Sequence, residues 1–481
     1  MTTDSDGAAR RPYRLLLVAL LFTGCAVGPD YHPPKTKLPA NWTEPTTGGT
    51  TNSPTKLAKW WKTFNDPELD SLIERAVKAN HDLRIAAGQL RESRALRTAG
   101  RWDFLPTITG NASYIDAQVS SNAQIFAFDT LHTSTYDAHF DASWEIDVFG
   151  GKRRGVEVLN ANLASTEEDR RDVLVSVLAE VARNYVELRG YQRRLAIARD
   201  NIAAQQAALE LTRARFKGGI SSKLDVAQAA ALLAGTQAEL PTLQGATKQT
   251  MHRLAVLVGQ TPDALITELS PDNAIPPIPP EVPVGLPSDL LRRRADVRRA
   301  EHQLASTTAR IGVETAELFP KFSLIGTGGF QSLSFSDWFS SGSRYWSAGP
   351  TVTWRLLEIG RIHSQIKAAN AREEQALALY EKTVLTSLED VENALVNYAQ
   401  EQERLRALRE QVTANRQAVE LANQLYSKGN SNFLDVLIVR RALYRAEDDL
   451  AQSERTVTTN LIALYKALGG GWEDIQLAGQ R

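Results

Sequence analysis

The sequence predicts a mainly α-helical protein with four long β-strands, built as an internal two-fold repeat. Three observations support this fold class. Long stretches are dominated by Ala, Leu, Gln, Glu and Arg, and aromatic residues make up only 7% of the chain, a composition typical of long helices. Shorter stretches alternate between apolar and polar residues, as strands do. Similar motifs also recur at a nearly constant distance, which indicates a duplication.

The duplication is visible in pairs of motifs. Phe104-Leu105-Pro106 resembles Leu318-Phe319-Pro320 at an offset of 214 residues, whereas Trp144 and Trp354 are 210 residues apart. Leu224-Asp225-Val226 and Leu434-Asp435-Val436 share the offset of 210. The offset changes once, so the first copy has a longer segment between the proline motif and the tryptophan.

The two repeats and the segments around them divide the chain into six parts. We predict a signal peptide at 1–24, an extended segment at 25–62, repeat 1 at 63–270 and repeat 2 at 287–472. A proline-rich connector at 271–286, which cannot be helical, joins the repeats. A short tail follows at 473–481.

Each repeat is expected to contain a helix, a strand pair, a long helix and a returning helix. The first helix of repeat 1 should begin at Pro67, because Asp66 is a good N-cap and proline is favoured at the first helical position. The matching helix of repeat 2 should begin at Pro287-Ser288-Asp289. Both helices are expected to end just before Pro106 and Pro320.

The strands are predicted from alternation. Residues 136–148 are apolar at every even position and polar or charged at every odd position. Residues 346–356 alternate similarly, and partner strands precede them at 107–114 and 322–331. A length of roughly a dozen residues suffices to cross a bilayer at a tilt, for which ~9–11 are needed, and the carboxylates suit a water-filled lumen.

Four strands cannot close a barrel alone. Alternation is also found in soluble sheets with one wet face, but an open strand edge is not tolerated in lipid. We therefore expect the strands to be pooled among subunits. Three copies would supply about twelve strands, a size known for membrane barrels.

Two long helices should follow the strands, from about Arg154 to Phe216 and from about Arg361 to Tyr426. Each is expected to turn at glycine, Gly218-Gly219 or Gly429, and to return as a helix that ends near Gly259 or Gly469. Paired helices of this length indicate coiled-coil packing. A soluble structural coiled coil is the alternative interpretation of the helices taken alone.

The N-terminus predicts secretion and lipidation. Three arginines precede the apolar run Leu15–Phe22, which ends at Thr23-Gly24-Cys25. This pattern predicts a signal peptide whose run is too short to span a bilayer, with acylation at Cys25. Ala26, next to the cysteine, favours the outer membrane. A free cysteine at the end of a signal anchor is the alternative.

Composition argues against several function classes. The 55 basic residues balance the 56 acidic ones, unlike in a nucleic-acid binder. The single cysteine excludes an internal disulfide, and the seven histidines lack ligand-like spacing. No catalytic constellation is visible. We expect no enzyme activity, no metal and no cofactor apart from the covalent lipid, palmitate, on Cys25.

Four motifs together carry a resemblance to a known family. They are Cys25–Tyr31, Trp60–Pro67, Leu286–Arg294 and Leu464–Trp472. The sequence resembles the outer-membrane factors of tripartite efflux, the TolC superfamily, and within it the NodT/OprM-type lipoproteins of resistance-nodulation-division pumps. Ala295 departs from the proline that the family usually carries after the arginine triplet.

The resemblance implies an architecture and a function. The expected assembly is a homotrimer with a twelve-stranded barrel in the outer membrane, four strands per chain, continuous with a long periplasmic α-helical barrel. It would be a passive exit duct for drugs or other small toxic molecules, lipid-anchored and extending into the periplasm. A periplasmic adaptor and an inner-membrane transporter of the resistance-nodulation-division type would be its partners.

The resemblance also implies a gate where the helix hairpins meet, at residues 216–226 and 426–436. Leu434, with Phe433 beside it, matches the family's constricting apolar ring, and Leu224 is its counterpart. Asp225 and Asp435 could line the aperture, where three carboxylates would favour cations. Aspartate in the first turn of a helix is, however, also favoured by the helix dipole alone.

Three further residues bear on that gate. Tyr426 and Phe216 precede the tip glycines, so they could hold a closed state through contacts between hairpins or be ordinary coiled-coil knobs. Ile438 stands where relatives often carry aspartate. If that position lines the pore, this gate is more apolar and less cation-selective than the family pattern.

Rival interpretations remain at this stage. A periplasmic adaptor lipoprotein would have one hairpin and a lipoyl-like β domain, which the duplication and four strands disfavour. A lipid-anchored enzyme would need convergent titratable residues, and none are visible. A TolC-type channel that secretes proteins is disfavoured by the efflux-type motifs. The arginine cluster Arg292–Arg299 is interpreted as a solvated helix face rather than a lipid or substrate site.

Overall fold

A computed structural model describes residues 26–43, 49–51, 53, 57–118 and 132–473 of the chain. The fold divides into two compact units. The first contains the chain up to Pro34, Leu90–Ser165 and Ala300–Tyr380; the second contains Lys35–Gln89, Thr166–Arg299 and the chain from Glu381. Four helices run through both units, and each unit is described by itself below. Cys25, the predicted signal peptide and residues 474–481 lie outside the described residues.

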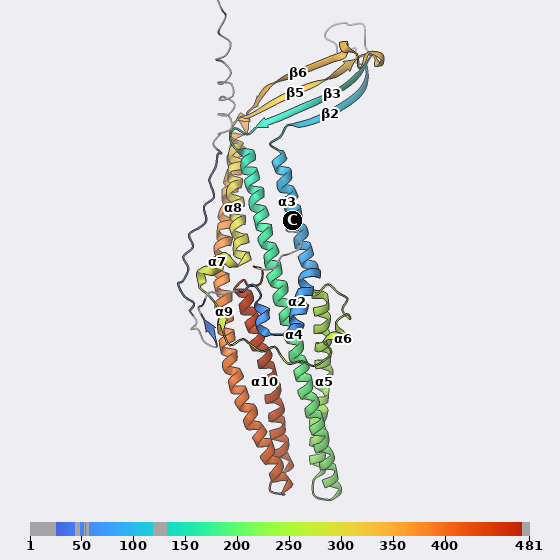
Figure 1. The fold of residues 1–481 in the computed structure, drawn as a ribbon, viewed down its shortest axis with the longest axis vertical. Coiled ribbons are helices and arrows are strands. Elements are labelled where there is room, and N and C mark those ends of the chain that lie inside the picture. Colours follow the sequence, from blue (N-terminus) through green and yellow to red (C-terminus); the bar gives the residue numbers. More distant parts are fainter. Residues whose placement is uncertain (1–25, 44–48, 52, 54–56, 119–131, 474–481) are drawn as a thin grey trace, which may run out of the picture. The chain divides into compact units, whose positions relative to one another are not determined.

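The elements follow the order helix, strand pair, helix hairpin twice along the chain (Figure 1). The helices are α2 (Pro67–Ala79), α3 (His81–Trp102), α4 (Gly151–Lys217), α5 (Lys223–Leu257), α6 (Ile266–Leu269), α7 (Leu290–Arg293), α8 (Ala295–Ala316), α9 (Ile359–Ser427) and α10 (Phe433–Ala467). The long strands are β2 (Thr107–Gln118), β3 (His132–Ile146), β5 (Lys321–Ser332) and β6 (Arg344–Thr353). Two short strands, β1 (Thr50–Thr51) and β4 (Val282–Pro283), pair in parallel.

The first unit contains the four predicted strands as one antiparallel sheet in the order β2-β3-β5-β6 (Figure 1). Registers such as Phe140 opposite Gly328 and Gly328 opposite Trp346 place all even positions on one face, as the alternation predicts. The predicted strand ends were too late, because β3 stops at Ile146 and β6 at Thr353.

Two equivalent tryptophans, near the ends of β3 and β6, bind the backbone of the proline motifs. The indole of Trp144 donates to the Phe104 carbonyl at 2.8 Å, and the indole of Trp354 donates to the Leu318 carbonyl at 3.0 Å. Trp354 thus lies beyond its strand, held by the backbone of the motif that ends in Pro320. The same bond is made once in each predicted repeat.

The predicted first helices are each broken. Asp66 caps α2 as expected, accepting from the backbone N–H groups of Glu68 and Leu69, but a single helix up to Pro106 was wrong. The chain breaks at Asn80, whose side chain accepts from the N–H groups of Asp82 and Leu83 and so starts α3. In the second repeat, a 3₁₀ turn and α7 come first, and the break lies at Arg294.

The long helices match the prediction closely. The helices α4 and α9 have 67 and 69 residues, and both α5 and α10 have 35. The turns contain Gly219 and Gly429 in the left-handed region, and Gly259 and Gly469 take the same conformation after the returning helices. Residues 271–286 contain no helix, in keeping with their prolines.

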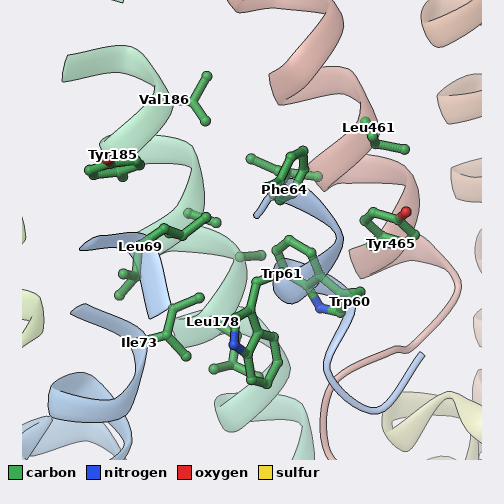
Figure 2. Packing of buried hydrophobic residues seen from close by; sticks show 14 of the residues in the cluster. Trp60, Trp61, Phe64, Leu69, Ile73, Leu178, Tyr185, Val186, Leu461 and Tyr465 are labelled. Carbon is green, nitrogen blue, oxygen red and sulfur yellow. The ribbon is translucent and has the colours of Figure 1, made fainter. Parts of the chain in front are cut away.

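The second unit has an aromatic core (Figure 2). Trp60, Trp61 and Phe64 lie in a 3₁₀ turn and are buried. Trp60 stacks on Tyr465 of α10 at 5.2 Å between ring centroids, while Leu178 and Tyr185 of α4 contribute to the same core. These contacts give the Trp60–Pro67 motif a packing role, because they tie the start of α2 to two long helices.

The arginine cluster of α7 and α8 is not a solvated face, so that prediction was wrong for most of it. Arg298 pairs with Glu168 at 2.7 Å, and Arg299 pairs with Asp169 and Asp172. Among the eight residues of the cluster, Arg292 is exposed and the others are partly or fully buried. Carboxylates of α4 thus pair with Arg298 and Arg299, which sequence proximity to Asp289, Asp296 and Glu301 did not reveal.

Candidate functional site at the hairpin ends

The end of the α4–α5 hairpin is a tight glycine turn. Gly219 adopts a positive φ of 72°, and the N–H of Ile220 donates to the Arg215 carbonyl at 2.9 Å. The new helix then starts with a capping box, in which Ser222 and Asp225 exchange side-chain and backbone hydrogen bonds. Asp225 is therefore engaged in starting α5.

The end of the α9–α10 hairpin has the same design with different residues. Gly429 takes the positive φ, and the N–H of Asn430 donates to the Leu425 carbonyl at 2.9 Å. Asn432 caps α10 by accepting from the N–H of Asp435 at 2.9 Å, and the Ser431 hydroxyl donates to the Asp435 carboxylate at 2.8 Å. Both predicted gate aspartates thus have a local structural role.

The two hairpin ends of the chain pack on each other through a small apolar cluster. Phe433 is only 5% exposed and belongs to the same buried cluster as Leu209 of α4 and Leu233 of α5. Tyr426 contacts Phe433 at 5.5 Å between centroids, and the guanidinium of Arg215 lies 4.2 Å from the Tyr426 ring. The predicted contact between hairpins through Tyr426 is present, with Arg215 as a partner that the sequence did not suggest.

Other predicted residues point outward. Leu434 is 46% exposed and its counterpart Leu224 is exposed as well, as is Ile438. Phe216 is 44% exposed and does not belong to the buried cluster. The structure thus separates neighbours in the sequence, because Phe433 is buried inside the hairpin pair while Leu434 is half-exposed.

Arg440 is a site residue that sequence reasoning did not single out. Its guanidinium donates to the Ala204 carbonyl of α4 and to the Asn423 side chain of α9, both at 3.2 Å. Burial lowers the pKa of Arg440. The cation links three helices close to the hairpin ends through neutral partners only among the described residues.

No cluster of three or more His, Cys, Asp or Glu side chains that could hold a metal occurs within the described ranges. Within the same ranges, none of the helices is both long and apolar enough to cross a membrane. A single chain exposes apolar side chains at its hairpin ends and along its sheet.

Comparison with known proteins identifies the class. The family described as outer membrane efflux protein matches residues 72–260 and 286–470. Nodulation protein T of Rhizobium leguminosarum bv. trifolii is 31% identical over 472 residues, covering 97% of this chain and 99% of the relative. The pyoverdine export outer membrane protein OpmQ of Pseudomonas putida is 34% identical, with 90% and 92% coverage.

A solved structure agrees with these relatives. The outer-membrane channel OprN superposes with a TM-score of 0.87 at 39% identity, covering 93% of this chain and all of that one. The protein is an outer-membrane channel of the TolC-like fold, and it is not an enzyme. The chain belongs to the outer membrane efflux protein family, and it is the outer-membrane exit duct of a tripartite efflux system.

Proposed function

We propose that three copies of the chain join their sheets into one twelve-stranded barrel in the outer membrane, continuous with an α-helical barrel in the periplasm. The observation that carries this proposal is the pair of open sheet edges. Within the described residues, β2 pairs only with β3, and β6 pairs only with β5. Open edges are costly in lipid, and edge pairing between copies removes them.

The two faces of the sheet suit this assembly. Large apolar side chains such as Ile108, Phe140 and Trp346 are exposed on the even face, where lipid would cover them. The odd face carries Asp137, His139 and Asp141, which would line a water-filled lumen. A further support for an internal two-fold repeat is that the family matches two separate segments of similar length.

The assembly is tested on detergent-extracted protein. We expect native mass spectrometry to show a species of three chains, and circular dichroism to show mainly helix with a β contribution. A monomer that stays in solution without detergent would contradict the barrel and would favour the periplasmic adaptor alternative.

The hairpin ends then form the periplasmic gate of the duct. Leu434 and Leu224 are exposed on a single chain, so they are available to form an apolar constriction around the threefold axis. Asp225 and Asp435 would follow the leucines at that aperture, while Phe433, Tyr426 and Phe216 flank it. A periplasmic adaptor and an inner-membrane transporter of the resistance-nodulation-division type would open this gate and deliver drugs or other small toxic molecules.

The gate is tested by single-channel recording in planar bilayers. Leu434→Ala is expected to raise the conductance, because it widens an apolar constriction. Leu421→Ala serves as the control, since Leu421 is also an exposed leucine, on α9, but lies before the turn. Equal conductance of the Leu434 variant and the wild type would remove this leucine from the gate.

The lipid anchor on Cys25 is the last part of the proposal. It is supported by the signal-like sequence before the cysteine and by its place next to Ala26. Labelled palmitate should be incorporated into the wild type and not into Cys25→Ala. Equal labelling of both proteins would rule out this residue as the acylation site.

A further inference from the structure

The residues that follow Cys25 are bound to the first unit by one buried arginine. The Arg154 side chain at the start of α4 is only 5% exposed. Its Nε donates to the Val27 carbonyl at 3.1 Å, and its Nη2 donates to the Gly28 carbonyl at 3.3 Å and the Asp30 carboxylate at 2.8 Å. Nη1 donates to Glu157 at 2.8 Å. One guanidinium thus binds three residues of an extended segment.

Close backbone contacts seat the same segment. Gly28 has a φ of +91°, and a Cβ there would lie 2.4 Å from the Cα of Gly312 on α8. A Cβ on Gly312 would in turn meet the Arg154 side chain at 2.7 Å, and a Cβ on Gly150 would lie 2.6 Å from Ala26. The segment therefore fits only because glycine stands at each crossing.

Two further contacts extend the attachment on both sides. The N–H of Val27 donates to the Phe149 carbonyl at 3.1 Å, just before α4 begins. The Tyr31 hydroxyl donates to Glu301 of α8 at 3.4 Å, and burial raises the pKa of Tyr31, so the hydroxyl keeps its proton. The segment consequently joins the helix of one predicted repeat to the helix of the other.

We propose that Arg154 is a positioning residue that docks Ala26–Tyr31 at the junction of β3 and α4, and so ties the lipid anchor to the membrane end of α4. The inference rests on the proposed acylation of Cys25, because that cysteine is joined to Ala26 by one peptide bond. A docked segment would keep the lipid at a fixed, short distance from α4, whereas an undocked segment would act as a flexible tether.

The experiment uses a nitroxide label at His32→Cys in the full detergent-extracted channel. His32 is exposed, and its ring bonds only locally, at the Asp30 carbonyl. Because the chain has one native cysteine, mass spectrometry also reports acylation: one label per chain when Cys25 carries lipid, and two when it is free. Two labels would therefore mark a failure of the lipidation proposal, separate from the docking.

The nitroxide at position 32 is expected to move slowly when Arg154 is present. In Arg154→Ala its motion should be severalfold faster, towards the ps–ns mobility of an exposed segment. Arg154→Lys should be intermediate, since one ammonium cannot reach all the acceptors. Gly155→Ala is the matched control, because a Cβ at this neighbouring position meets no atom within 4 Å. Helix content and unfolding temperature should stay near wild-type values in the lysine and control variants.

A label that stays slow in Arg154→Ala would overturn the inference. If that variant does not fold, Asp30→Ala decides the matter, because the exposed Asp30 can be changed without opening the interior. Faster motion in Asp30→Ala, which removes an acceptor of Arg154, supports the docking, and unchanged motion overturns it.

Discussion

At two places in the second unit, here called corners, a residue that separates two consecutive helices also binds the end of a returning helix. The two corners do this with different chemistry. In the first corner the Asn80 amide donates to the carbonyl of Leu257, the last residue of α5, at 2.9 Å. In the second corner the Arg294 guanidinium donates to the carbonyl of Ala467, the last residue of α10, at 3.2 Å. Asn80 and Arg294 are 214 residues apart and the two carbonyl residues are 210 apart, so the two bonds occupy positions that the sequence predicts to be equivalent.

The two corners differ in which side chain accepts from the backbone N–H groups at the start of the following helix. Asn80 also accepts from the start of α3, so one neutral side chain serves both helix ends. Arg294 cannot accept a hydrogen bond. Asp296 therefore accepts from the N–H of Val297 and binds Arg294 at 2.7 Å, while Asp390 binds it at 2.9 Å. The same backbone requirement is met once by an amide and once by an ion-pair network.

The largest effect is expected from Arg294→Ala. The substitution leaves the Asp296 and Asp390 carboxylates without their cation and the Ala467 carbonyl without its donor, so it should cost about 3–5 kcal/mol of unfolding free energy. Thermal unfolding in detergent measures it, with the exposed Arg292→Ala as the control, expected within about 0.5 kcal/mol of wild type. A cost below about 1 kcal/mol would show that the second corner does not depend on charge.

The hairpin ends extend the comparison, since they too use equivalent positions differently. Phe433 begins α10 and is buried, whereas Lys223 begins α5 at the equivalent position. Phe433→Ala should cost about 3 kcal/mol locally, because it empties the cluster between the hairpins. Lys223→Ala should change stability by less than about 0.5 kcal/mol. Hydrogen exchange of residues 426–440 would measure both, and equal protection in the two variants would contradict the asymmetry.

A smaller effect is expected in the first corner. Asn80→Ala removes the cap of α3 and the donor to Leu257, at a cost of about 2 kcal/mol. Asn80→Asp keeps the acceptor and loses only the donor, so it should cost less than the alanine variant. The reverse order, measured by the same thermal unfolding, would mean that the bond to Leu257 matters more than the cap.

The smallest effect is a difference in acid response. Burial opposes ionisation of Asp296, but its hydrogen bonds with Arg294 prevail and hold the pKa below its ordinary value of 3.8. A lowered carboxyl pKa stabilises the folded state above the ordinary pKa, and this stabilisation is lost as the pH falls through the lowered value. Unfolding followed below pH 4 should therefore be less pH-dependent in Asp296→Asn than in the wild type. If unfolding of the two proteins depends on pH in the same way, a group other than Asp296 causes the loss of stability in acid.

The elements of this chain were predictable from short-range patterns. Asp66 with Pro67, the tip glycines and the alternation of 136–148 each predicted a local structure that is present. The break at Asn80 was missed because the side chain's second partner, Leu257, is 177 residues away in the sequence. The strand ends were placed too late because Trp354 continues the alternation although its indole bonds to Leu318.

The candidate site was predictable in part for the same reason. Turn glycines located the hairpin ends, because they act on their own backbone, and the family resemblance placed the predicted gate there. The burial of Phe433 beside the exposed Leu434, and the contact of Arg215 with Tyr426, depend on how α4, α5, α9 and α10 pack. Arg440 gave no sequence signal, since its partners are a backbone carbonyl and an asparagine on other helices.

The sequence by itself determined the kinds of elements and their order, because helix-favouring composition, strand alternation and turn residues act over a few neighbouring positions. Its motifs indicated the family. Only the tertiary structure decided which polar groups satisfy one another. Arg154 with Val27–Asp30, Arg294 with Asp390, and Arg298 with Glu168 are joined across long separations. A charge has no preferred partner in the chain until packing brings one within hydrogen-bonding distance.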